Sequence, residues 1–135
     1  MMTKYLIAYA AAAFVLFALD FLWLGTLAGP FYREKLANIL SERPNIPASV
    51  AFYAFYCIGV VIFAEMRGFE NQSALYALGF GALFGFFAYA TYDITNYATL
   101  KDFPLVIAVL DISWGTALTG VSAFAGYYAA TFFKG

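Results

Sequence analysis

Three aspartates stand inside or at the edge of long apolar runs, where a charged carboxyl group is costly to bury. They are Asp20, Asp93 and Asp111, and no Lys or Arg lies within the runs. Such acids can be protonated, share a proton, bind a cation, or reach a basic loop residue such as Arg33. We therefore expect Asp20, Asp93 and Asp111 to form an ion- or proton-binding site.

Both tryptophans of the chain follow an aspartate by three positions, Trp23 after Asp20 and Trp114 after Asp111. Residues three apart share one face of a helix. Each indole could therefore donate its N–H to a carboxylate, or form the wall of a pocket for a flat or cationic ligand.

A polar stripe accompanies the second of these aspartates, Asp93. Tyr92, Asn96 and Thr99 follow one another at helical spacing, and Asn96 stands three residues after Asp93. A functional site and a simple set of interhelical hydrogen bonds both fit this pattern. Under the functional interpretation, the pocket-lining residues are Trp23, Tyr92, Asn96, Thr99 and Trp114.

The helices that must position these residues cross a membrane. Four apolar runs each reach or approach the ~20 helical residues that span a hydrocarbon core. The chain is 64% hydrophobic and 11% charged, which argues against a soluble helical bundle with polar faces. We expect an all-α polytopic membrane protein forming a single domain over residues 1–135. Its four transmembrane helices are expected at about 5–27, 47–64, 73–100 and 104–133.

The three aspartates are expected at one depth in this bundle. Each lies seven residues from the end of its span on the same side of the membrane, counted from residues 27, 100 and 104. A rise of 1.5 Å per residue puts each acid about 10 Å from that end. Equal depth is necessary for the acids to meet, although it does not by itself bring them together.

The connection between the first two spans contains its own pattern. Pro30 suits a helix start and Pro44 a stop, which predicts a short amphipathic helix lying in the membrane interface. A solvated loop is the alternative. Gly81 and Gly85 have the spacing of close helix packing. Three basic residues on the face of the termini against four on the other leave the membrane orientation open.

Composition also restricts the ligands. The chain has no histidine, which removes imidazole-ligated haem and the usual zinc and copper sites, and we expect no cofactor. A net charge of −1 without a basic block gives no indication of nucleic-acid binding. The expected partner is the lipid bilayer, and near-balanced loop charges would permit an antiparallel homodimer.

From Tyr92 onward the chain resembles a family of bacterial predicted membrane proteins, named only as domain of unknown function 2177. The likeness rests on YDITNYATL, on FPL and DISWG after it, and on the Asp-x-x-Trp of the first span. The resemblance implies a multi-pass protein of the bacterial inner membrane. It supplies no activity, substrate or catalytic residue.

Three functions therefore stay open. The first is a proton- or cation-coupled carrier of an apolar or cationic solute, which uses the intramembrane aspartates. The second is a non-catalytic subunit of a larger membrane complex, an assembly factor, or a lipid- or pigment-binding protein. The third is a divalent-metal-dependent enzyme acting on a lipid phosphate, which the lack of a paired DxxD motif makes the weakest of the three.

Overall fold

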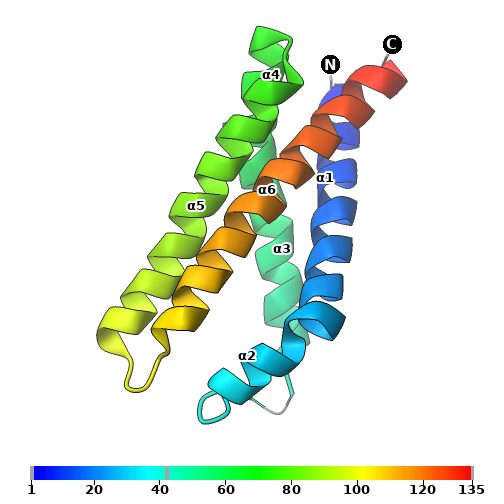
Figure 1. The fold of residues 1–135 in the computed structure, drawn as a ribbon. Coiled ribbons are helices and arrows are strands. Elements are labelled where there is room, and N and C mark those ends of the chain that lie inside the picture. The colour runs from blue at the N-terminus through cyan, green and yellow to red at the C-terminus, as the bar shows by residue number, and fades with distance from the viewer. Residues whose placement is uncertain (1, 42, 135) are drawn as a thin grey trace.

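The computed structural model describes residues 2–41 and 43–134, and all regular structure in these residues is helical. Four helical segments are long and apolar enough to cross a membrane, and they run alongside one another in a bundle (Figure 1). Their bounds are Met2–Leu27, Ile46–Asn71, Ala74–Thr99 and Leu105–Phe133. The predicted all-α protein with four candidate membrane spans is confirmed.

Two of the spans contain a five-residue π-helical stretch, which the sequence pattern did not indicate. The elements in chain order are α1 (Met2–Leu22), η1 (Trp23–Leu27), α2 (Gly29–Lys35), α3 (Ile46–Val60), η2 (Val61–Glu65), α4 (Met66–Asn71), α5 (Ala74–Thr99) and α6 (Leu105–Lys134). A π-helical turn holds more residues than an α-helical turn, so it rotates the side chains that follow, and it often occurs at functional sites.

The bundle has two distinct ends. Both chain termini and α4 lie at one, called the terminal end below (Figure 1). The other, called the hairpin end, holds α2 and the tight connection between α5 and α6 (Figure 1). The three aspartate-bearing helix segments lie in the half of the bundle nearer the hairpin end, as counting along the spans predicted.

The helix expected between the first two spans is present as α2, but it is shorter than the segment bounded by Pro30 and Pro44. Leu36 leaves helical geometry with φ −109° and ψ 20°. Its side chain is buried with those of Tyr32, Phe103 and Ile107. This contact anchors α2 to the start of α6, and the chain after it continues in turns because the anchor fixes Leu36 away from the helical path.

The second span is longer than the predicted segment 47–64. It starts after Asn45, whose side chain accepts a hydrogen bond from the Ala48 N–H at 3.0 Å, and it continues to Asn71. Polar residues after Ala64 suggested an end to the apolar run, yet the helix buries Glu65 completely and carries on. The span ends at Gln72, which adopts a left-handed conformation with φ 50°.

Close packing of α5 on α6 forms the main helix interface. A Cβ atom built on Gly85 would lie 2.4 Å from the carbonyl oxygen of Gly115, and one on Gly81 would lie 2.8 Å from the Cβ of Ala123. Only glycine permits this approach at either position, as the glycine spacing suggested. The interface holds α5 and α6 in the relative position that brings Asp93 and Asp111 together.

Candidate functional site

Asp93 on α5 and Asp111 on α6 face each other across this interface. Asp93 is fully buried, and neither of its carboxyl oxygens receives a hydrogen bond from an N–H or O–H donor. The half-buried Asp111 carboxyl is close enough to interact with it electrostatically. Two adjacent carboxylates repel unless a proton or a cation lies between them. A shared proton would give both groups a partner.

Asp20 on α1 has two donors from other helices. The Trp114 indole N–H donates to one carboxyl oxygen at 3.0 Å, and the Tyr53 hydroxyl donates to the other. Asp20 is 7% exposed. Its carboxyl group therefore connects α1 with both α3 and α6 inside the bundle.

Asp111 also receives a donor from outside the four spans. The Tyr32 hydroxyl of α2 donates to its carboxyl oxygen at 2.9 Å, and the Trp23 indole N–H points at the same hydroxyl at 3.4 Å. Burial, and then the nearby Asp111 carboxyl, raise the pKa of Tyr32 above its ordinary value of 10.0. Tyr32 therefore stays protonated and keeps its hydrogen to donate.

The two indole rings join these groups into one network. Trp23 and Trp114 stack with ring centroids 4.4 Å apart and ring planes 5° apart. Neither N–H turns to the aspartate three residues earlier in its own helix. Trp114 on α6 donates to Asp20 on α1. Trp23 donates to the hydroxyl of Tyr32, which in turn donates to Asp111. The tryptophan of each Asp-x-x-Trp motif thus donates to a group on another helix. The spacing of residues along one helix could not indicate these partners.

A cavity of about 550 Å³ opens beside this network, between α3 and α5. Asp111 contributes to its wall, so the network and the cavity share one carboxyl group. Half of the lining residues are aromatic. The lining consists of Asn45, Ala48, Ser49, Phe52, Tyr53, Tyr56, Ala88, Tyr89, Tyr92 and Asp111.

The predicted polar stripe of α5 divides between the site and the helix surface. Tyr92 lines the cavity, whereas Asn96 and Thr99 are not among its lining residues. Thr99 is exposed and donates its hydroxyl hydrogen to the Thr95 carbonyl of its own helix at 2.7 Å. The structure thus brings Tyr92 to the cavity and leaves Asn96 and Thr99 outside it.

Several residues of the site gave no signal in the sequence. Tyr32 lies in the connection after the first span, and Tyr53, Tyr56 and Tyr89 lie in apolar runs where aromatic residues are common. Tyr56 shares a hydrogen bond of 2.7 Å with the Thr119 hydroxyl, which fixes its ring beside the cavity. Glu65 was also missed, because it comes directly after the expected end of the second span.

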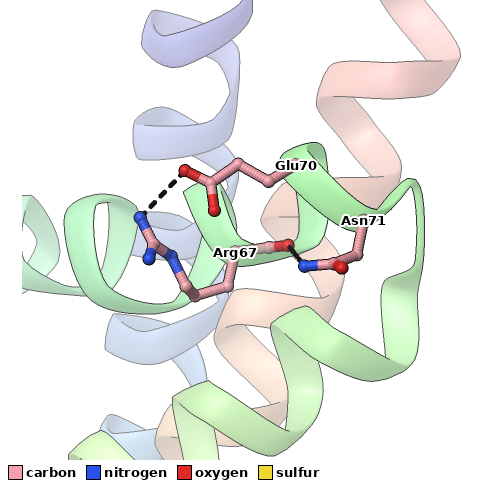
Figure 2. A network of polar contacts seen from close by, with 3 residues as sticks. All are labelled: Arg67, Glu70 and Asn71. Carbon is pink, nitrogen blue, oxygen red and sulfur yellow. Dashed lines mark hydrogen bonds and ion pairs between the residues drawn. The ribbon is translucent and has the colours of Figure 1, made fainter.

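Acidic side chains in the described part of the chain do not gather into a metal site. No group of three or more His, Cys, Asp or Glu residues is close enough there to hold a metal ion. The only ion pair among residues 2–41 and 43–134 joins Arg67 and Glu70 at 3.0 Å, in α4 at the terminal end (Figure 2). Arg33, which could have reached the aspartates, makes no ion pair with them.

Comparison with known proteins agrees with the fold. No curated protein and no solved structure matches the chain. One family model does match, over residues 5–128, and its description is a predicted membrane protein. The match includes both Asp-x-x-Trp motifs and the whole aspartate network. The chain therefore belongs to the family of predicted membrane proteins called domain of unknown function 2177.

Proposed function

We propose that this protein is a small carrier that exchanges protons for an apolar or cationic solute. Asp111 provides the observation that carries the proposal, because it lines the cavity and also faces the carboxyl group of Asp93. A cation that enters the cavity would compete with the proton shared by Asp93 and Asp111. Loading one ligand then favours release of the other, which is the thermodynamic requirement for exchange.

The residues that line the cavity favour binding of a cationic solute over an anionic one. Aromatic faces attract cations, and five aromatic rings surround the single lining carboxyl group. None of the described lining residues is Lys or Arg, so a phosphate would meet no positive partner. A volume of about 550 Å³ is within the ordinary range for small-molecule sites.

Asp20 would be the second proton-binding group of the carrier. Its donors Tyr53 and Trp114 connect it to the cavity wall and to the stacked indoles. Movement of α3 away from α1 would break the bond from Tyr53 and open the cavity further. The hydrogen bonds available to Asp20 would therefore depend on the position of α3.

A metal-dependent lipid-phosphate enzyme receives less support. Mg²⁺ sites are built from several oxygen ligands, and no three acidic or metal-binding side chains come together within the described residues. A non-catalytic membrane subunit is the second candidate, and it applies if the protein transports no solute. The carrier proposal takes the membrane to be the bacterial inner membrane, as the family resemblance implies, and it requires no second copy of the chain.

The test is solute-driven proton movement in sealed vesicles. Purified protein is reconstituted with a pH-sensitive dye inside, and tetraphenylphosphonium, an aromatic cation, is added outside. We expect proton efflux with the wild-type protein, and expect Asp111→Asn to reduce it to the level of vesicles without protein. Asn removes the charge at the cavity wall and keeps the size of the side chain.

Asp102→Asn provides the matched control. Asp102 lies in the exposed hairpin with φ 64°, a conformation that Asn adopts as readily as Asp. This variant should move protons as the wild type does. If wild-type vesicles move no protons with tetraphenylphosphonium or with a panel of apolar solutes, the carrier proposal fails and the subunit alternative takes its place.

A further inference from the structure

Glu65 is a second buried acid, separate from the aspartate network. It is the last residue of η2 and is 0% exposed. Neither of its carboxyl oxygens has a hydrogen-bond donor among the described residues. It lies towards the terminal end of the bundle, whereas the three aspartates lie towards the hairpin end.

The position of Glu65 is fixed by a glycine on the facing helix. A Cβ atom built on Gly126 of α6 would lie 1.5 Å from the Glu65 Oε2 atom, so any larger residue would displace the carboxyl group. The same point is 2.7 Å from the carbonyl oxygen of Ala8 on α1. The two oxygens are therefore at most 4.2 Å apart, the sum of 1.5 and 2.7 Å.

Two acceptor oxygens that face each other in an apolar interior need a hydrogen between them. The Ala8 carbonyl has two lone pairs, and one remains for a further donor after the bond within α1. A carboxylate at Glu65 would have no donor and would face a second negative dipole. A neutral carboxylic acid could donate its O–H to the Ala8 carbonyl.

No nearby charge provides an alternative partner. Arg67 is only two residues further on, but its guanidinium turns to Glu70 at 3.0 Å (Figure 2). None of the titratable or charged groups on the elements packed against η2 donates to Glu65. Among the described side chains, these groups are Lys4, Tyr5, Tyr9 and Asp20 on α1, Tyr53, Tyr56 and Cys57 on α3, Arg67 and Glu70 on α4, Tyr76, Tyr89, Tyr92, Asp93 and Tyr97 on α5, and Asp111, Tyr127 and Tyr128 on α6.

We propose that Glu65 is a proton-binding site of the membrane interior, whose proton bridges η2 to the Ala8 carbonyl of α1. Loss of this proton would leave a charge without a partner beside Ala8 and Gly126, which is unfavourable in an apolar interior. Ionisation of Glu65 therefore requires η2 to separate from α1 and α6. The inference stands whether or not the protein carries a solute.

Infrared difference spectroscopy tests the protonation directly. The spectrum of wild-type protein minus that of Glu65→Gln at pH 7 should contain the carbonyl band of a protonated carboxylic acid, shifted in D₂O. Gln keeps the shape and can donate an amide N–H to Ala8, so the variant should fold. Glu70→Gln is the control, and its difference spectrum should lack the carbonyl band of a protonated carboxylic acid, because Glu70 is exposed and paired with Arg67.

Labelling with dicyclohexylcarbodiimide gives a second result that needs no variant. This apolar reagent adds to a protonated carboxyl group, whose proton moves to a carbodiimide nitrogen as the carboxyl oxygen bonds to the central carbon. Rearrangement gives a stable acylurea with no leaving group. Peptide mass spectrometry should find the adduct on Glu65 and not on Glu70. A wild-type spectrum with only ionised carboxylate at this residue overturns the proposal.

Discussion

Trp114 gives Asp20 a hydrogen bond that no residue of α1 provides. An indole N–H is a donor only, so its direction commits it to one acceptor, and here that acceptor is a nearly buried carboxyl group on another helix. Trp23 has the same position after its own aspartate, yet its indole N–H donates to the Tyr32 hydroxyl at 3.4 Å instead of to a carboxyl oxygen. The two tryptophans are therefore chemically unequal, although their sequence contexts match.

This inequality predicts different costs for the same substitution. Trp114→Phe should lower the free energy of unfolding by about 1–3 kcal/mol more than Trp23→Phe, because only Trp114→Phe leaves one oxygen of a nearly buried carboxyl group without its donor. Both variants lose a similar part of the indole stack, so the difference isolates the hydrogen bond. Thermal unfolding in detergent measures it. Equal losses for the two variants would contradict the assigned role of Trp114.

At the scale of the helices, glycine residues determine how closely neighbouring helices approach one another. Gly85 of α5 lies against the backbone of α6, whereas Gly79 of the same helix has no atom within 4 Å of a Cβ built on it. The two positions differ by about one and a half helical turns and face different surroundings. The α5–α6 interface also sets the distance between Asp93 and Asp111.

Gly85→Ala should therefore separate α5 from α6 and lower the free energy of unfolding by about 1–3 kcal/mol, the usual cost of overpacking. Gly79→Ala should be neutral or stabilise the protein by up to ~1 kcal/mol, because alanine favours a helix more than glycine does. Unfolding of the two variants, measured side by side, makes the comparison. A Gly85→Ala protein as stable as Gly79→Ala would show that the close approach is not required.

The cavity and the packing of small residues occupy opposite ends of the bundle. The cavity is lined by Asn45, Ala48 and Ser49 from the start of the second span, near the hairpin end. Towards the terminal end the interior is filled by small buried residues such as Ala64 and Ala123. Access to the aspartates is therefore expected from the hairpin side.

Labelling of engineered cysteines with a membrane-impermeant thiol reagent tests from which side of the membrane the cavity is reached. Ser49→Cys should react in vesicles when the reagent is on the hairpin side, because Ser49 lines the open cavity. Ala123→Cys is the control and should stay unreactive from both sides, since Ala123 is 0% exposed. The native Cys57 is buried and adds no background. Reaction of Ser49→Cys only from the side of the termini would reverse the assignment and remove the proposed entry path.

The sequence by itself determined the four candidate spans and how far along its span each of the three aspartates lies. Bilayer thickness fixes the length of an apolar run, and the constant rise of a helix converts residue counts into depth. Both rules are local, so they need no knowledge of the neighbouring helices. The second span and the helix after the first span were less well predicted, because buried polar Glu65 and the anchoring of Leu36 depend on contacts from other elements.

Only the tertiary structure decided which groups meet. The partners of Asp20 come from α3 and α6, and that of Asp111 comes from α2, at sequence separations of 33, 94 and 79 residues. Helix rotation and the two π-helical stretches set these directions, and neither follows from the period of an apolar run. The isolation of Glu65 is likewise a property of packing, because a carboxyl group next to an apolar run becomes a proton-binding site only when no donor faces it.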